Sequence, residues 1–324
     1  MSTDFSYLLK KIEQTDFSTT PFKHLEIADF LAPEHFDAIV RTPQIKLDGY
    51  QTTEALLDGL EANGYVIIPF PGCVTNKKEY LTWFHGHSHK KVHEATESFG
   101  IVLRLAKYQT AILEDLNKFF ESPELVSVLC RKFGIDGKLT VDAGLQKYLH
   151  GYEISPHPDI RRKALTWMLN INPGTNPEEA EFHTHYLQFK PEFRFITEFW
   201  KGNTGFDREW VPWGWCETAK RQRANNSIVF FSPSNDTMHA VKADYDHLKT
   251  QRTQFYGNLW YPNIPIKKIS FKAFDIAANQ ERVEASLPLH KKVRANLKNT
   301  KLGDTYRAIK KTLTGENNEK IRKV

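Results

Sequence analysis

Two strand-like stretches in the second half of the chain alternate strictly between polar and apolar side chains. Between Leu165 and Ile171 every second residue is large and apolar, and the residues between them include Thr166 and Asn170. The stretch 252–260 repeats this alternation. Because neighbouring side chains of a strand point to opposite faces, each stretch has one apolar and one polar face. We therefore predict a sheet that packs on one side and faces a ligand cavity on the other.

The first 135 residues have mostly helical spacing, with local signals for helix ends. Ser122-Pro123 is typical of a helix start and Gly134 of a helix end, because Ser caps free N–H groups and Gly tolerates the left-handed turn. The pattern predicts an α+β protein with helices packed outside a sheet. The predicted helices are 5–13, 33–40, 53–62 and one that starts at 122, and the predicted strands are 22–27 and 65–70.

These patterns divide the chain into three parts. We expect a mixed, largely helical layer in residues 1–138, a strand-rich core in 139–262 and a basic extension in 263–324, in which Asp304 could cap a last helix. The stretch 182–226 carries four tryptophans and several glycines, so we expect partly irregular structure there. Long structured loops of this kind are often lids over a site.

Charge is unevenly distributed between these parts. Residues 291–324 hold 11 Lys and Arg against 3 Asp and Glu, a net +8, which leaves −3 for the rest of a chain whose total is +5. The strand-rich core is therefore not basic, which argues against nucleic acid as its substrate. The sequence does not fix the oligomeric state.

Other features of the composition narrow the class of protein. No apolar run reaches the ~18 residues of a membrane-spanning helix. The first residues lack the apolar stretch and cleavage site of a secretory signal. The three cysteines lie far apart in sequence, which favours free thiols in a reducing compartment. We expect a cytoplasmic protein.

The candidate chemistry lies next to the predicted strands. His157 and Asp159 are two residues apart, and such residues share one face of a strand, so they could hold one metal ion. His239 follows the apolar run 227–232 and is the candidate third ligand. Two histidines and one carboxylate leave three positions open on Fe(II), as in non-haem oxygenases. The alternative is a surface turn at His157-Pro158-Asp159 and an unrelated core histidine.

Together with Arg252, which follows His239 by 13 positions, these residues resemble the HxD…H…R pattern of Fe(II)/2-oxoglutarate-dependent oxygenases. The flanking residues resemble most the prolyl-4-hydroxylase-like branch, and the resemblance covers roughly residues 141–261. It implies a double-stranded β-helix, or jelly-roll, core. It also implies hydroxylation of a C–H bond with O2 and 2-oxoglutarate, which gives succinate and CO2. Asp159 occupies a position where related halogenases have a small residue, which favours hydroxylation over halogenation, with desaturation and ring closure as alternatives.

The resemblance also implies a co-substrate site. Arg252 would bind the distal carboxylate of 2-oxoglutarate, because a guanidinium forms two parallel hydrogen bonds to a carboxylate. Tyr148 would donate a hydrogen bond to the same group. Gln146 shares the face of Tyr148, and Asn170 points inward in our register, so both are candidate co-substrate contacts. Core packing of Tyr148 and an exposed Arg252 are the alternatives.

The substrate is less defined by the sequence. Cations follow the metal motif at Arg161 and precede the His239 strand, so an anionic small molecule is a candidate substrate, although a solvated charged face explains them equally simply. A peptidyl or prolyl hydroxylase and a non-catalytic jelly-roll protein that binds a metal or ligand are alternatives. Residues 85–93 contain four histidines without a carboxylate at strand spacing, which favours a solvated surface. The candidate substrate contacts are Trp167, Arg161, His183, His185 and Trp213.

Overall fold

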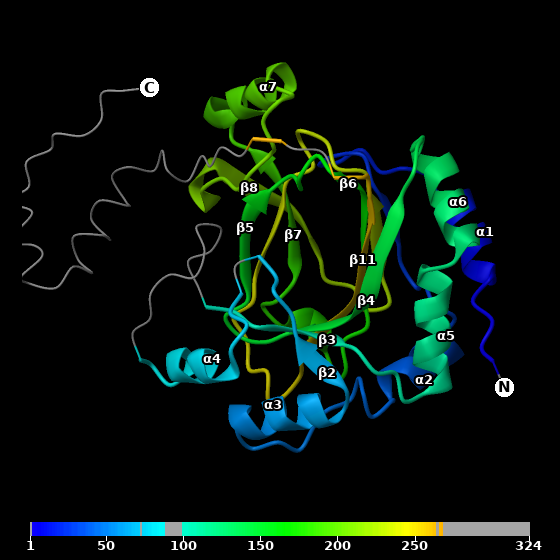
Figure 1. Ribbon diagram of the computed structural model, residues 1–324, viewed down its shortest axis with the longest axis vertical. Helices are drawn as coiled ribbons and strands as arrows, with labels where there is room; N and C mark the ends of the chain where they lie inside the picture. The colour runs from blue at the N-terminus through cyan, green and yellow to red at the C-terminus, as the bar shows by residue number, and fades with distance from the viewer. Residues whose placement is uncertain (1, 72, 88–98, 264–265, 268–324) are drawn as a thin grey trace, which may run out of the picture. The chain divides into compact units, whose positions relative to one another are not determined.

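The computed structural model describes residues 2–71, 73–87, 99–263 and 266–267 (Figure 1). The chain divides into two units, 1–272 and 273–324, and every described residue belongs to the first. The helix predicted after Asp304 lies outside the described residues. The divisions predicted at 138 and 262 stay predictions.

Within the described residues, the strands form two antiparallel sheets. The larger sheet has the order β1-β9-β6-β11-β4-β3-β2. Its two longest strands pair along nine residues, from Arg252 opposite Tyr148 to Trp260 opposite Thr140. The members of this sheet are β1 (Leu25–Ile27), β2 (Tyr65–Ile67), β3 (Val102–Leu105), β4 (Thr140–Tyr148), β6 (Lys163–Asn170), β9 (Ile228–Phe231) and β11 (Arg252–Trp260).

The smaller sheet has the order β5-β10-β7-β8. Its members are β5 (Glu153–His157), β7 (Thr184–Phe189), β8 (Cys216–Gln222) and β10 (His239–Lys242). From β4 to β11 the chain passes repeatedly between the two sheets: β4, β6, β9 and β11 belong to one, and β5, β7, β8 and β10 to the other. This alternation is that of a double-stranded β-helix, so the predicted fold class is confirmed.

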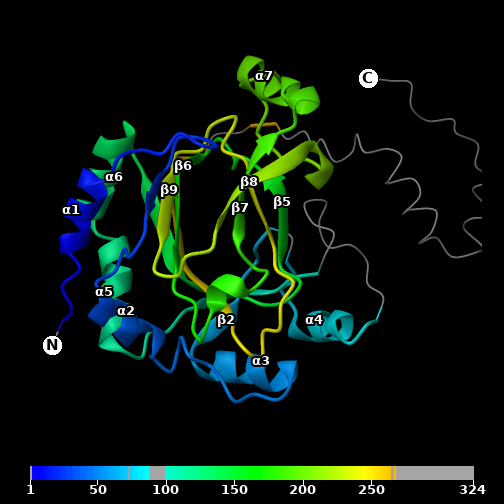
Figure 2. The ribbon, with the colours of Figure 1, turned by 180° about the vertical axis from the view of Figure 1, so that it is seen from behind.

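Helices cover the outer side of the larger sheet (Figures 1 and 2). The helices α5 and α6 lie beside β4, and α1 packs on α6, so one apolar core joins these helices to the sheet. None of the described helices is long and apolar enough to cross a membrane. The helices are α1 (Tyr7–Gln14), α2 (Pro33–Val40), α3 (Thr53–Ala62), α4 (Lys77–Phe84), α5 (Ala111–Phe120), α6 (Pro123–Phe133) and α7 (Phe195–Gly202), with short 3-10 turns at Pro177–Glu179, Pro191–Phe193 and Trp213–Trp215.

Local signals place several helix ends correctly. The Ser122 hydroxyl accepts a hydrogen bond from the N–H of Leu125, and Pro123 is the first helical residue of α6. Gly134 ends that helix with a left-handed φ of 66°. The predicted bounds of α2 and α3 agree with the structure, whereas the predicted strands 22–27 and 65–70 shorten to β1 and β2. The helix-capping chemistry is local, and for this reason the sequence alone reveals it.

Alternation along β6 and β11 divides the interior into two regions. Trp167 points to the helix side, where its ring stacks on Phe120 at 5.9 Å and packs against Phe230. Gly257, its partner on β11, provides the space for the indole, because a Cβ at this position would lie 2.2 Å from the ring. The opposite face of β11 carries Arg252, Gln254, Tyr256, Asn258 and Trp260, and all five line a cavity between the sheets.

Residues 182–226 are partly irregular, as expected, but the irregular part is short. This stretch contains β7 and β8, which pair along the edge of the smaller sheet, with α7 between them. The indoles of Trp200 and Trp215 pack in a separate apolar cluster, and only Trp210 of the four tryptophans lines the cavity. The irregular part is therefore restricted mainly to residues 203–212, between α7 and the turn before β8.

Candidate metal centre and cavity

The three predicted ligands meet at one end of the smaller sheet. His157 ends β5 and His239 begins β10, and the two are register partners. Asp159 follows two residues after His157. Its Oδ1 lies 3.5 Å from His157 Nε2, and its Oδ2 lies 3.9 Å from His239 Nε2. Within the described ranges, this is the one group of three or more His, Cys, Asp or Glu side chains whose donor atoms lie within 4.8 Å of one another.

The backbone conformation that brings Asp159 close to the two histidines differs from the prediction. The strand ends at His157, and Asp159 has a left-handed φ of 65°. The two residues therefore face each other across a turn, not along one face of a strand. The turn is fixed from the β10 side, because the Thr237 hydroxyl donates to the carbonyl of Pro158 at 3.0 Å. Left-handed backbone at a residue other than Gly is uncommon and is found often at functional sites.

Both histidines are oriented by backbone carbonyls. His157 Nδ1 lies 2.8 Å from the carbonyl oxygen of Ser155, and His239 Nδ1 lies 2.9 Å from that of Thr237. A carbonyl only accepts, so each Nδ1 carries the proton and each neutral ring presents an unprotonated Nε2. Burial, with His157 adding to the effect, lowers the pKa of His239 to about 3. The donor set thus fits a divalent metal ion, which requires neutral imidazoles.

Asp159 is held as a carboxylate. Burial by itself would raise its pKa, but neighbouring groups, the Lys163 ammonium first among them, outweigh that effect and hold the pKa well below its usual range. Lys163 Nζ donates to Oδ1 at 2.6 Å, and the Thr166 hydroxyl donates to Oδ2 at 2.8 Å. Hydrogen bonds of this kind fix the orientation of a metal-binding carboxylate.

A cavity of about 490 Å³ extends from these residues between the two sheets. Its size is within the usual range for small-molecule sites. Arg252 lines it from the start of β11 and is 2% exposed. Its Nη2 donates to the Thr184 hydroxyl at 3.0 Å, and its guanidinium lies 4.4 Å from the centre of the Tyr148 ring. Among the described residues, no carboxylate forms an ion pair with Arg252.

Tyr148 also lines this cavity, and its hydroxyl is hydrogen-bonded to Gln146. The Gln146 carboxamide accepts from Arg104 Nη2 at 2.7 Å and donates to the Tyr148 hydroxyl at 2.5 Å. The phenol proton of Tyr148 is then available to another acceptor. Asn170 does not line the cavity: its Nδ2 donates to the carbonyls of Gln222 and Ala224, and its Oδ1 accepts from Gln254. Gln146 and Asn170 are thus supporting residues in this geometry.

The predicted substrate contacts are not among the residues that line this cavity, and their role in substrate binding stays a prediction. Trp167 is in the helix-side core. Arg161 donates from Nε to the carbonyl of Phe206, so its side chain binds the segment that follows α7. His183 Nε2 contacts the carbonyl of Glu178, and His185 Nδ1 contacts the Thr218 hydroxyl. Trp213 donates from its indole to Glu153.

The structure adds residues at the metal centre and the cavity that the sequence did not single out as site residues. Lys163 is four positions after Asp159, and the alternation along β6 places Thr166 inward, so both could have been found from the pattern. Thr184, which contacts Arg252, and Arg208 and Trp210, which line the cavity, lie in stretches without a helical or strand signal strong enough to orient them.

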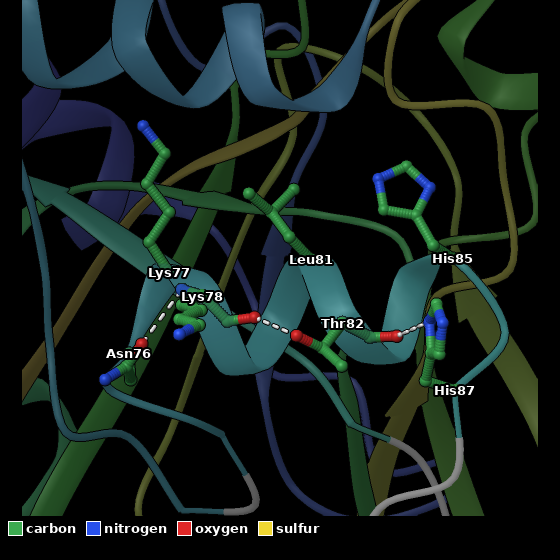
Figure 3. Close-up of a pocket in the computed structure, with 7 residues that line it drawn as sticks. All are labelled: Asn76, Lys77, Lys78, Leu81, Thr82, His85 and His87. Carbon is green, nitrogen blue, oxygen red and sulfur yellow. Dashed lines mark hydrogen bonds between the residues drawn. The ribbon is translucent and has the colours of Figure 1, made fainter.

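A second hollow lies on the surface beside α4 (Figure 3). His85 contacts Glu54, and His87 Nδ1 lies 3.2 Å from the carbonyl of Thr82. His89 and His93 of the predicted histidine cluster lie outside the described residues. The two described histidines therefore contact the protein itself at this surface.

No family model matches the sequence, and no curated protein matches it. The structure is similar to a prolyl-4-hydroxylase from Pseudomonas putida, with 11% identity, coverage of 79% of this chain and 98% of that chain, and a TM-score of 0.41. It is also similar to a prolyl hydroxylase from Trichoplax adhaerens in complex with a hypoxia inducible factor peptide fragment (13% identity, coverage of 65% and 94%, TM-score 0.33). A third is HygX from Streptomyces hygroscopicus with nickel and 2-oxoglutarate bound (9%, 65% and 87%, TM-score 0.29). Prolyl hydroxylases, the branch that the sequence motif resembles, are thus among the similar structures.

Proposed function

We propose that this protein is an Fe(II)- and 2-oxoglutarate-dependent dioxygenase that hydroxylates a C–H bond of a small molecule and releases succinate and CO2. One observation carries the proposal: a His-Asp-His group and a buried Arg252 without a carboxylate partner among the described residues line the same cavity. A metal site with only a structural role does not require a buried cation in the same cavity. Because the three cysteines are free thiols, we place the enzyme in a reducing compartment such as the cytoplasm.

The metal would be held by His157, Asp159 and His239. This ligand set leaves three positions open, enough for a bidentate co-substrate and O2. When bound, Fe(II) supplies the redox chemistry that couples loss of CO2 from 2-oxoglutarate to attack on an unreactive C–H bond. The chain's own contribution is to keep both Nε2 atoms unprotonated and the carboxylate ionised and oriented.

Arg252 would bind the carboxylate of 2-oxoglutarate that is distant from the metal. Thr184 takes one guanidinium N–H, which leaves others for a paired hydrogen bond to a carboxylate. The Tyr148 phenol proton is available to the same carboxylate, and its ring supports the guanidinium face. The backbone of Arg252 is fixed in turn by the Tyr245 hydroxyl, which accepts from its N–H at 3.0 Å.

The cavity walls favour a small substrate. Phe70, Trp210 and Ile154 close the space between the two sheets around the metal ligands. A largely apolar enclosure excludes water and strengthens the charge interactions of bound groups. A volume of about 490 Å³ suits a compact molecule together with 2-oxoglutarate, and this volume is the observation that favours a small molecule over a folded protein as substrate.

Replacing Arg252 tests the proposal. We expect Arg252→Ala to raise the dissociation constant of 2-oxoglutarate by roughly 10²- to 10⁴-fold, because loss of one partner of a buried charge pair costs ~3–5 kcal/mol. Arg252→Lys should lie between, since it keeps the charge but loses the forked geometry. The measurement is calorimetric titration of 2-oxoglutarate into anaerobic, Fe(II)-loaded protein.

Iron affinity serves as the internal control, because Arg252 is not among the three proposed ligands and both variants should bind Fe(II) as the wild type does. Arg221→Ala, on the solvent side of β8, controls for loss of a positive charge. Equal 2-oxoglutarate affinities of wild type and Arg252→Ala would refute the assignment of Arg252. A wild type that binds no 2-oxoglutarate would move the protein to the non-catalytic class.

A further inference from the structure

We propose that Arg208 binds an oxyanion of the substrate, a carboxylate or a phosphate, in the part of the cavity away from Arg252. The inference rests on the proposed function and deepens it, since it names a chemical class of substrate. It starts from a second buried cation that lines the same cavity as the metal ligands.

Arg208 is buried without a hydrogen bond to its Nε, although Asp159, Asp207 and Asp236 attract its charge. Its side chain is 5% exposed, and its Nε is buried without a hydrogen-bond partner in the described part of the chain. Among the described residues, no carboxylate forms an ion pair with it. Burial lowers the pKa of Arg208 to about 10, so the guanidinium stays charged at pH 7. A buried charge that forms no ion pair is unfavourable, and a bound anion would offset that cost.

The backbone around Arg208 is tied to the metal motif. The Asp207 carboxylate accepts from the N–H of Arg161 at 2.7 Å and from that of Arg208 at 2.9 Å. The N–H of Val211 donates to the carbonyl of Pro156, the residue before His157. Arg208 is therefore positioned relative to the metal ligands by hydrogen bonds on both sides, as a binding residue should be.

Arg208 and Arg252 serve different parts of the cavity. Arg252 is the first residue of β11. Tyr256 lies four positions further along this strand, which corresponds to ~13 Å. The Tyr256 hydroxyl accepts from Lys163, which in turn holds Asp159, and Asp159 attracts Arg208. Arg208 is thus associated with the Asp159 end of the cavity, whereas Arg252 contacts Thr184 and Tyr148 at the other.

Charge balance gives the reason for an anionic substrate. Lys163 is paired with Asp159, and Arg104 is paired with Asp142 at 2.6 Å. The two carboxylates of 2-oxoglutarate carry as much charge as Fe(II), so Arg252 and Arg208 give the groups that line the cavity an excess of positive charge. Asp207 and Asp236, which do not line the cavity, attract Arg208 without forming an ion pair with it. Because a low-dielectric cavity penalises such an excess of positive charge, a substrate with an oxyanion would fit it better than a neutral one.

The test is a calorimetric titration of small oxyanions into the full chain, anaerobic, loaded with Fe(II) and saturated with 2-oxoglutarate. The probes are benzoate and phenyl phosphate, with benzamide as their neutral counterpart. We expect at least one oxyanion to bind the wild type about tenfold or more tightly than benzamide, and Arg208→Gln to lose that advantage. The oxyanion that binds better identifies the carboxylate or the phosphate as the preferred group.

Two controls separate the proposed role from a structural one. Arg208→Gln should keep the wild-type affinity for 2-oxoglutarate, which shows that the fold and the Arg252 site are intact. Arg221→Gln removes a charge at the surface and should bind the probes as the wild type does. Equal oxyanion binding by wild type and Arg208→Gln, or no oxyanion binding by the wild type, would overturn the inference. Failure of 2-oxoglutarate itself to bind would instead refute the proposed function.

Discussion

The carboxylate of Asp159 has three kinds of neighbour within hydrogen-bonding distance or close to it. Two imidazoles face it, a threonine hydroxyl donates to one oxygen, and the Lys163 ammonium donates to the other. A cation beside a metal-binding carboxylate weakens attraction for the metal but keeps the carboxylate free of protons. The balance between these two effects depends on pH, because protons and metal compete for the same oxygens.

Lys163→Met should make metal binding more sensitive to acid. Burial raises the pKa of Asp159 and Lys163 lowers it, so removal of Lys163 lets the pKa rise. Protons then compete better with the metal, so on acidification the affinity should begin to fall at a higher pH in the variant than in the wild type. Titration of Fe(II) under anaerobic conditions at a series of pH values measures this. Profiles that begin to fall at the same pH in the two proteins would contradict the role of Lys163. Lys201→Met, on the surface of α7, is the matched control.

At the scale of single elements, sequence reasoning succeeded where the signal was local or periodic. The alternation along β11 placed Arg252 and Gln254 on the cavity face, and the structure confirms that register. Sequence reasoning failed where tertiary contacts determine the structure. The strands β7 and β8 carry mixed patterns, and β7 pairs with β10 on one side and with β8 on the other. The backbone N–H of Arg208 is held by the Asp207 carboxylate. No periodicity in the sequence could reveal such contacts.

Gly257→Ala tests the packing that separates the core from the cavity. The new methyl would lie 2.2 Å from the indole of Trp167, which Phe120 and Phe230 hold in place. We expect a loss of ~1–3 kcal/mol in the free energy of unfolding, typical of an overpacked core, measured by urea denaturation. Gly205→Ala is the matched control, since a Cβ there meets no atom within 4 Å. Equal stability of the two variants would mean that β11 and β6 separate easily.

At the scale of the whole molecule, the described unit unites distant parts of the chain. Leu25 pairs with Phe230 in the larger sheet, and Phe206 forms an isolated bridge with Lys267. The HxD…H…R resemblance predicted the jelly-roll core because the strands of that core carry the motif residues. The pairing of β1 with β9 involves none of these residues, so the sequence did not predict it. The described unit is therefore held together by contacts between residues near both of its ends.

Lys147 makes the stability of this unit depend on pH. It is 0% exposed, donates to the carbonyl of Ile45 and to the Thr253 hydroxyl, and burial lowers its pKa to about 7. An unfolded lysine has a pKa of ~10.4, so between these values the unfolded chain binds a proton that the folded chain lacks. Stability then rises with pH through this window, and below ~7 the contribution is constant.

Lys147→Met should remove this dependence. From pH 7 to pH 9 the wild type should gain about 2 kcal/mol more in its free energy of unfolding than the variant does. Urea denaturation at both pH values gives the comparison, and Lys201→Met at the surface should behave as the wild type. Identical gains for wild type and Lys147→Met would show that Lys147 is paired or hydrated in solution.

Deletion of residues 291–324 tests whether the basic extension belongs to the site. The metal ligands, Arg252 and the rest of the cavity lie before residue 261, and the last described contact, between Asp207 N–H and the carbonyl of Lys267, is kept in the truncated chain. We expect unchanged affinities for Fe(II) and 2-oxoglutarate by calorimetry. The deletion removes a net +8 and leaves −3, so retention on a cation exchanger at pH 7 should be lost. A truncated chain that no longer binds 2-oxoglutarate would show that the extension completes the cavity, and the division of the chain at 262 would then be wrong.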